Sequence, residues 1–221
     1  MERRFSNREA AGRALAAELV ELDVVDSDRS RTIVLGLPRG GVPVASVVAA
    51  TFGVPLDVIV VRKVGVPGHA ELAMGAIASI AGSVVTLRND AVLGSVGADA
   101  RRRFDEVAAR ERIELDRRQE LYRAGLAPLD VRGKDVILVD DGIATGSTMH
   151  AAVLALEPAG AASVTIAVPV GPSDTLAEFE SLVDRVVCVS VPEQFWAVGQ
   201  AYEDFTQTSD DEVRRLLGVR E

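Results

Sequence analysis

The stretch from Val136 to Thr148, which reads VILVDDGIATGST, constrains this chain most strongly. Its first four residues form an unbroken apolar run, which predicts a short strand buried on both faces. Two carboxylates, Asp140 and Asp141, follow at once, and a turn of small and hydroxyl residues leads into a helix-forming segment from Met149 to Leu156. The sequence therefore predicts a buried strand with an acidic end, and a loop that delivers the chain to a helix N-terminus.

The loop after the two carboxylates has the composition of an anion-binding site. Free backbone N–H groups and the positive end of the helix dipole favour a phosphate at such a point. The carboxylates at the end of the strand suit a vicinal diol or a hydrated cation, and a phosphate beside a diol describes a ribose 5-phosphate. The alternative is an ordinary capped helix after an acidic strand end, but the small residues cluster where anions bind.

The two commoner phosphate loops are excluded. No lysine follows Gly146, so the stretch is not the G-x-x-x-x-G-K-[ST] nucleotide loop, and G-x-G-x-x-G occurs nowhere in the chain.

The stretch resembles the phosphoribosyl-diphosphate (PRPP) signature of type I phosphoribosyltransferases, in which an apolar strand, two acids and a T-G-[small]-T loop follow one another. The resemblance implies an α/β fold with a twisted, mainly parallel sheet flanked by helices, a small hood and a helical insertion. It also implies that Asp140 and Asp141 bind the ribose hydroxyls and act in catalysis. The loop residues that would bind the 5-phosphate are Ala144, Thr145, Gly146, Ser147 and Thr148.

A second strand–turn–helix unit precedes this one. Thr32 to Leu37 is a predicted buried strand, and Val42 to Phe52 a predicted helix, with Arg39, Gly40 and Gly41 in the turn between them. Arginine can hold phosphate oxygens bidentately, and glycines let the backbone approach a ligand closely. By resemblance, these three turn residues bind the pyrophosphate of PRPP, although such a turn taken alone is more often only a turn.

The next predicted strand, Leu56 to Val61, ends in two cations, Arg62 and Lys63. The carboxyl ends of parallel strands face the crevice where such sheets bind ligands, and the resemblance assigns this pair to the PRPP phosphates. A solvated pair of cations is the alternative, and Lys63 is the stronger candidate for a catalytic role.

The segment from Gly65 to Leu72 contains two glycines and a proline, which predicts a mobile loop. It matches the loop that closes over the active site in the family. Closure would exclude water from a reacting ribosyl cation. His69 and Glu71 are therefore candidates for contacting pyrophosphate or moving a proton, and a surface histidine without a function is the alternative.

The segment from Asp99 to Arg123 is densely charged and has a thin apolar stripe, which predicts a long helix solvated over most of its surface. Further short apolar strands alternate with helices, as in parallel βαβ units. We expect one domain over residues 1–221, with a core at about 30–87 and 130–191, a helical insertion at about 95–127, and a hood formed by 192–221 with or without N-terminal residues.

The C-terminal segment gathers aromatic residues that are scarce elsewhere, since aromatics make up 4% of the chain. It resembles the tail of 6-oxopurine phosphoribosyltransferases, in which an aromatic ring stacks on the base. This resemblance suggests Phe195 or Trp196 as the stacking residue and Asp204 as an acid near the metal. Capping of the sheet edge is the alternative for the aromatics.

Charge and composition narrow the choice of partners and location. The formal charge of −9, from 33 acidic and 24 basic residues, argues against a nucleic-acid surface. No apolar run reaches the length of a membrane span, no signal-peptide core follows Met1, and the single cysteine, Cys188, excludes an internal disulfide. We expect a cytoplasmic protein without a membrane or nucleic-acid partner, with a homodimer left open.

The resemblance implies a transferase that moves the ribose 5-phosphate group of PRPP to a nucleobase-like, purine-type acceptor and releases pyrophosphate. Mg²⁺ would be held mainly by PRPP and water, as this ion commonly is. In 6-oxopurine enzymes an aspartate of the phosphate loop contacts the base, and Ala144 stands there in this chain, so the acceptor and the general base stay open. The alternative is a regulator that senses PRPP with little or no turnover.

Overall fold

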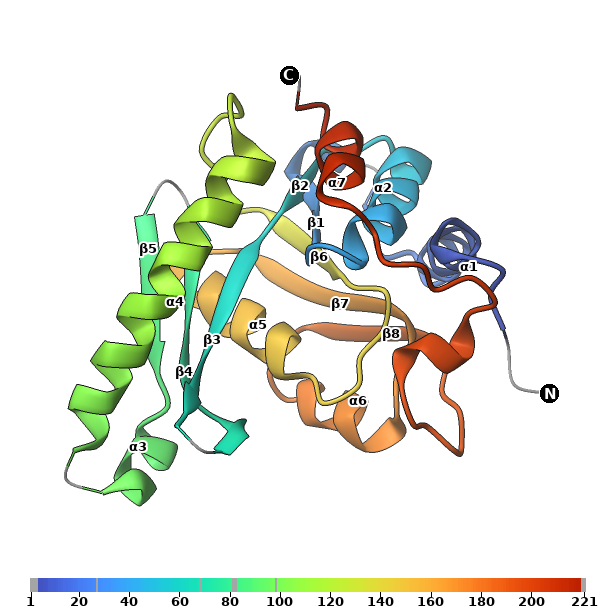
Figure 1. Ribbon diagram of the computed structural model, residues 1–221. Helices are drawn as coiled ribbons and strands as arrows, with labels where there is room; N and C mark the ends of the chain where they lie inside the picture. Colours follow the sequence, from blue (N-terminus) through green and yellow to red (C-terminus); the bar gives the residue numbers. More distant parts are fainter. Residues whose placement is uncertain (1–3, 27, 68, 81–82, 98, 220–221) are drawn as a thin grey trace.

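The computed structural model describes residues 4–26, 28–67, 69–80, 83–97 and 99–219, without the side chains of 69–72, 83 and 91. Its centre is a five-stranded parallel sheet (Figure 1). The strands lie in the spatial order β2 (Leu56–Val58), β1 (Thr32–Gly36), β6 (Asp135–Val139), β7 (Ser163–Val170) and β8 (Arg185–Ser190). The parallel sheet confirms the α/β architecture expected from the sequence.

Both faces of this sheet are covered because its strands are apolar on both sides. Alternate residues of β1 enter different clusters: Val34 packs with α1 (Arg8–Glu21) and α2 (Gly41–Phe52), whereas Leu35 packs with α5 (Ser147–Ala159) on the opposite face. A short helix, α6 (Ser173–Phe179), packs into the same cluster as Leu35 and α5. Burial of alternate side chains on opposite faces fixes the register of each strand.

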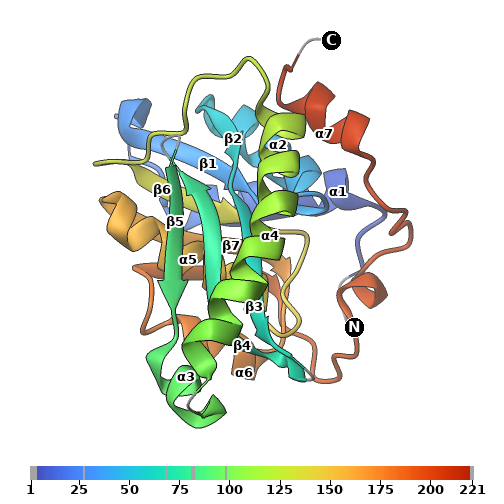
Figure 2. The same ribbon diagram turned by 60° about the vertical axis from the view of Figure 1, so that its left-hand side comes forward.

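A second, antiparallel sheet of three strands lies beyond α5, so that this helix is packed between the two sheets. It contains β3 (Val60–Val66), β4 (His69–Ile80) and β5 (Ser83–Arg88), followed by a short helix, α3 (Asp90–Val96). The long helix α4 (Ala100–Arg123) lies across the outer face of β3 and β4 (Figure 2). Its buried residues, among them Phe104 and Leu115, form the third apolar cluster with that sheet.

The order of the parallel strands locates the place where a ligand is expected. The chain runs from β1 to β2 on one side and returns through β6 on the other, so β1 and β6 flank the point at which the order reverses. Ligands of open α/β sheets bind outside the carboxyl ends of the strands at this switch point. The turn after β1 and the acidic end of β6 both lie there.

The segment 191–206, which we call the hood, lies over one end of the parallel sheet (Figure 1). It contains the 3-10 turn η2 (Val198–Ala201) and pairs with the N-terminal segment through a bridge between Phe5 and Tyr202. Another 3-10 turn, η1 (Arg29–Arg31), precedes β1, and α7 (Asp210–Leu216) packs near α2 and α4.

Two local predictions were wrong. The strand expected from Leu56 to Val61 is split between two sheets, so Arg62 and Lys63 lie within antiparallel β3 and not at the end of a parallel strand. The segment expected to be a loop from Gly65 to Leu72 contains the ends of β3 and β4, because backbone pairing with the neighbouring strand overrides the turn-forming composition. At the start of the chain, Asn7 caps α1, and its side-chain oxygen accepts from the Ala10 N–H at 2.9 Å.

No helix in the part of the chain that the structure describes combines the length and the apolarity needed to cross a bilayer.

Candidate functional site

The acid pair and the glycine turn meet at the switch point of the parallel sheet. The Leu37 N–H donates to the Val139 carbonyl at 2.9 Å, which continues the pairing of β1 with β6 beyond the strand end. Asp140 and Asp141 therefore lie beside the Arg39–Gly41 turn. The two loops predicted from separate stretches of sequence form one site.

Glycine is required in this turn because the acids lie against its backbone. A β-carbon at Gly40 would stand 2.0 Å from Asp141 Oδ2, and one at Gly41 would stand 2.7 Å from the Val139 carbonyl oxygen. Both separations are shorter than any van der Waals contact. The turn thus approaches the acid pair as closely as a backbone without side chains allows.

Arg8 and Tyr202, which the sequence analysis did not single out, hold Asp141 from outside the sheet. Arg8 Nε donates to Asp141 Oδ2 at 2.8 Å, and the two side chains are only 11% and 14% exposed. The Tyr202 hydroxyl donates to the Asp141 backbone carbonyl at 2.6 Å. Arg8 also donates to the Thr206 carbonyl at 2.6 Å, and its guanidinium lies 4.2 Å from the centre of the Phe205 ring. The hood and α1 therefore fix the second acid.

Burial makes the acid pair unusually basic. Desolvation, and then repulsion from Asp141, raise the pKa of the Asp140 carboxyl well above its usual range. Burial also raises the pKa of Asp141, and the hydrogen bond and charge of Arg8 oppose that rise. A cation or a set of hydroxyl donors bound beside the pair would relieve both effects.

The loop after the acids presents a helix N-terminus to the same region. Gly146 precedes α5 with φ at +68°, and a β-carbon there would meet the Phe179 ring at 2.9 Å. The Thr175 hydroxyl donates to the Ala144 carbonyl at 3.0 Å, which fixes the orientation of that peptide group. Among the described residues, the N–H groups of Ala144, Thr145 and Gly146 have no hydrogen-bond acceptor, so they are available to an anion.

Arg39 is partly engaged by a neighbouring acid. Its Nη1 lies 3.7 Å from Asp210 Oδ1 at the start of α7, and the same oxygen accepts from the Tyr122 hydroxyl at 2.5 Å. Burial and the Asp210 carboxylate raise the pKa of Tyr122 to about 12, so it stays protonated as the donor. The ion pair of Arg39 is long and partly exposed, which leaves the guanidinium able to turn toward a ligand.

Arg62 and Lys63 line a cleft of about 670 Å³ that Pro38 and Thr148 also line, between β3 and α4. Arg62 pairs with Glu111 of α4, with its Nε 2.7 Å from Oε2. Lys63 has no carboxylate partner within the described part of the chain. The side chains of His69 and Glu71 lie outside the described residues, so their predicted roles stay predictions.

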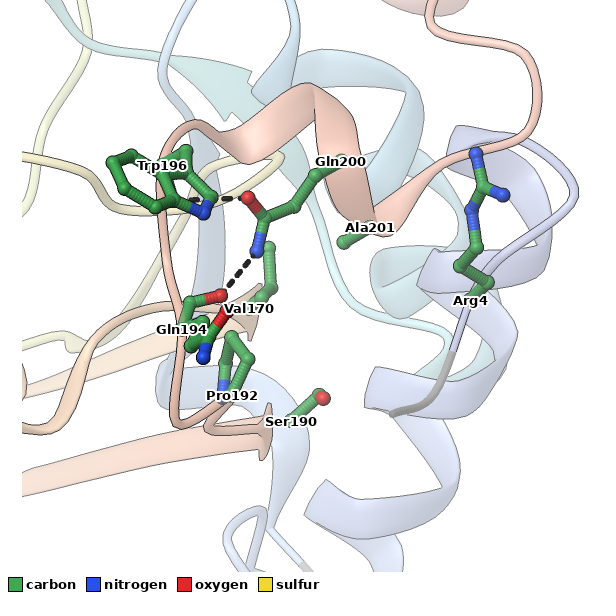
Figure 3. Close-up of a pocket in the computed structure, with 8 residues that line it drawn as sticks. All are labelled: Arg4, Val170, Ser190, Pro192, Gln194, Trp196, Gln200 and Ala201. Carbon is green, nitrogen blue, oxygen red and sulfur yellow. Dashed lines mark hydrogen bonds between the residues drawn. The ribbon is translucent and has the colours of Figure 1, made fainter. Parts of the chain in front are cut away.

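A second cavity, of about 380 Å³, lies under the hood at the ends of β7 and β8 (Figure 3). The Gln200 side chain closes one side, because its Oε1 accepts from the Trp196 backbone N–H at 2.9 Å and its Nε2 donates to the Gln194 carbonyl at 2.7 Å. Trp196 lines this cavity and is 86% exposed, whereas Phe195 packs against the apolar cluster of the hood. Of the two predicted aromatics, only Trp196 is placed so that a flat ligand could stack on it.

The residues present fit a magnesium ion held mainly by its ligand. Asp140 and Asp141 offer the oxygen donors that Mg²⁺ prefers, and no cluster of three or more His, Cys, Asp or Glu side chains occurs in the described ranges. Asp204, the other predicted acid, accepts from the Thr206 N–H and hydroxyl at 2.9 and 2.7 Å, which lowers its pKa. It lines a separate surface cavity with Arg8.

Comparisons with known proteins identify the family of this chain. A family model described as phosphoribosyl transferase domain matches residues 4–206. The protein named "Putative phosphoribosyl transferase Rv0571c" from Mycobacterium tuberculosis strain H37Rv is 47% identical over 213 residues, which are 96% of this chain and 46% of that protein. The chain thus spans about half the length of the curated relatives it matches.

Among solved structures, TT1426 from Thermus thermophilus is similar over 97% of both chains, with a TM-score of 0.84 and 40% identity. AQ2163 from Aquifex aeolicus is similar in fold alone, with a TM-score of 0.50 and 10% identity over 96% of this chain and 83% of that one.

Proposed function

This chain belongs to the phosphoribosyl transferase domain family, and we propose that it transfers the ribose 5-phosphate group of PRPP to a nucleobase-like acceptor and releases pyrophosphate. The observation that carries the proposal is the contact between two loops at the switch point. A glycine turn that suits a diphosphate lies against two carboxylates that suit ribose hydroxyls, and a helix N-terminus that suits a phosphate follows them.

Each part of PRPP has a matching part of the site. The 5-phosphate binds the free N–H groups of the loop from Ala144 to Thr148, the ribose hydroxyls bind Asp140 and Asp141, and the pyrophosphate binds the backbone of Gly40 and Gly41. Arg39 turns from Asp210 toward the pyrophosphate when PRPP is bound. Bound Mg²⁺ would neutralise pyrophosphate charge; PRPP and water would supply most of its ligands, and Asp140 and Asp141 would be the protein's oxygen donors.

The protein part of catalysis is positioning and electrostatic stabilisation. As pyrophosphate leaves, positive charge develops on the ribosyl carbon, and in this proposal the carboxylates of Asp140 and Asp141, which bind the ribose hydroxyls, stabilise it electrostatically. Lys63 and Arg39 hold the departing pyrophosphate. His69 and Glu71, on the β3–β4 hairpin beside the cleft, are proposed to contact the leaving group or move a proton.

The acceptor binds under the hood. A ring nitrogen of a flat base, such as a purine, attacks the ribosyl carbon while the base stacks on Trp196 in the cavity at the ends of β7 and β8. The absence of a carboxylate at Ala144 means that this loop does not take the proton of a 6-oxopurine.

The proposal is tested by incubating the protein with PRPP, Mg²⁺ and a panel of bases and amines while pyrophosphate release is measured. We expect release with at least one flat nitrogen base, and loss of PRPP binding in the variant that combines Asp140→Asn with Asp141→Asn. Tight, Mg²⁺-dependent binding of PRPP with no release for any acceptor would replace the transferase by a PRPP sensor. Unchanged PRPP affinity in the double variant would overturn the assignment of the acid pair.

A further inference from the structure

The cleft between β3 and α4 is strongly basic although the chain as a whole is acidic. Four of its lining residues are cationic and one is a carboxylate: Arg62, Lys63, Arg110 and Arg118, against Glu111. A protein with a formal charge of −9 has to concentrate cations to create such a surface. Clefts of one charge sign attract ions of the other sign.

Pairing within the protein engages only two of these four cations, Arg62 and Arg118. Glu111 is occupied by Arg62. Glu114 accepts from Arg118 at 2.7 Å and also from Arg117 at 2.8 and 3.0 Å, so one carboxylate serves two guanidinium groups. The hydrogen bond from Arg117 is the largest of the effects that lower the pKa of Glu114 to about 2.

Two cations of the cleft are left without a carboxylate in the part of the chain that the structure describes. Lys63 has no ion pair, and Arg110 donates its Nε only to the Glu106 carbonyl of its own helix, at 3.3 Å. The exposed side of α4 offers a contrast in Arg112, which donates to both carboxylate oxygens of Asp116, at 2.8 and 2.9 Å. An ordinary solvated helix pairs its charges in this way along its length.

The helix is held firmly enough to present these side chains at a fixed place. Arg123, at the C-terminal end of α4, donates to both carboxylate oxygens of Asp57 in β2 at 2.8 and 2.7 Å, and the two side chains are 5% and 15% exposed. Tyr122 donates to Asp210 of α7. The α4 side of the cleft is therefore anchored to the rest of the fold.

The cleft opens directly onto the proposed PRPP site. Pro38, which precedes the Arg39–Gly41 turn, and Thr148, in the first turn of α5, both line it. We infer that Arg110 of α4, which lines this cleft together with Lys63, is a further residue that binds the diphosphate of PRPP. The inference rests on the proposed function and gives the charged helix a role in binding the donor.

Guanidinium and ammonium groups differ in what they contribute there. Arg110 can hold two phosphate oxygens at once through its planar fork, whereas Lys63 acts as a point charge from the opposite wall. Since both groups are reachable by water, their contribution should fall as ionic strength rises.

The test measures binding of inorganic pyrophosphate and of PRPP, each with Mg²⁺, to the full chain by titration calorimetry. The variants are Arg110→Ala and Lys63→Ala, with Arg112→Ala as the matched control from the exposed side of the same helix. We expect Arg110→Ala and Lys63→Ala to weaken both ligands about tenfold at low salt, and Arg112→Ala to bind as the wild type does. Equal melting temperatures of Arg110→Ala and Arg112→Ala establish that any difference in binding is local.

If Arg110→Ala binds both ligands as tightly as Arg112→Ala, the inference is overturned, while a wild type that still releases pyrophosphate keeps the transferase proposal intact. If pyrophosphate binding depends on Arg110 but no acceptor supports turnover, the inference stands and the transferase proposal fails. Absence of pyrophosphate and PRPP binding in the wild type overturns the inference outright.

Discussion

Gly40 controls how closely the diphosphate turn can approach the acid pair. A methyl group at this position would overlap Asp141 Oδ2, so the turn or the carboxylate must move. We expect Gly40→Ala to weaken PRPP binding by at least about tenfold, a cost of about 1.4 kcal/mol. Gly94→Ala in α3 is the control, because no atom lies within 4 Å of the added carbon. Calorimetric titration with PRPP would contradict the prediction if both variants bound equally well.

The buried carboxyl of Asp140 should lower the stability of the fold while it contributes to PRPP binding. Its folded pKa lies above the usual value of 3.8, so above that pH the folded chain keeps a proton that the unfolded chain has lost. Rising pH therefore lowers the free energy of unfolding through this carboxyl until the folded pKa is passed, so this group makes the wild type less stable at neutral pH than near pH 4. Asn at this position does not titrate, so it removes this pH-dependent loss of stability.

We therefore expect Asp140→Asn to melt a few degrees higher than the wild type at pH 7 and to bind PRPP more weakly. The gap in melting temperature should shrink as the pH falls toward 4. Melting curves recorded across this pH range test the sign, and a gap that stays constant with pH would show that the carboxylate is not the cause.

At the scale of elements, α4 is secured by one buried ion pair. Arg123 is 7% exposed, and its removal would leave the Asp57 carboxylate buried without its partner. We expect Arg123→Ala to lower the free energy of unfolding by about 3 kcal/mol, whereas Arg112→Ala, whose ion pair is half-exposed, should cost less than about 1 kcal/mol. Urea unfolding of the two variants gives both values, and similar costs would mean that α4 is not anchored through Arg123.

Helices and strands could be predicted from the sequence wherever the apolar residues follow a single helical or strand-like spacing. The strands of the parallel sheet, the helix of Asp99 to Arg123 and the two loops at the switch point follow from apolar runs and glycine turns. The antiparallel pairing of the strand that contains Arg62 and Lys63 could not be predicted, because an apolar strand has the same sequence pattern in a parallel and in an antiparallel sheet. Strand pairing between β3 and β4 is decided by tertiary contacts that no local window contains.

Site residues divide in the same way. Asp140, Asp141 and Gly40 carry a local pattern, whereas Arg8 reaches Asp141 across 133 residues of sequence and Arg110 is one arginine among many in α4. An arginine that neutralises a distant acid has no local signature. Spacing alone therefore could not separate Arg110 from Arg112, although their surroundings in the fold differ.

At the scale of the whole molecule, donor and acceptor are proposed to bind in different parts: PRPP at the switch point and the base under the hood. Trp196 is the only tryptophan and is 86% exposed, so its fluorescence should respond to the acceptor. We expect a blue shift when base is added to the PRPP complex, and about a tenfold rise in acceptor KM for Trp196→Ala with PRPP affinity unchanged. Phe195→Leu, at the partly buried neighbouring residue, should lower the melting temperature and leave the acceptor KM nearly unchanged.

If Trp196→Ala weakened PRPP binding as much as it raised the acceptor KM, the separation of the two subsites would be contradicted. Unaltered KM and fluorescence would place the acceptor elsewhere on the molecule.

The bridge between Phe5 and Tyr202 joins an early and a late part of the chain, so it can form only late in translation. The Phe5 N–H donates to the Ala201 carbonyl and the Glu203 N–H to the Phe5 carbonyl, each at 2.8 Å. A ribosome supplies the N-terminal partner long before the residues of the hood. Domains fold as their residues emerge, so the parallel sheet can form on the nascent chain before the hood exists. Asp141 gains the Tyr202 hydroxyl and the fixed Arg8 only after Thr206 has left the ribosome, so the ribose site is completed after the parallel sheet has been translated.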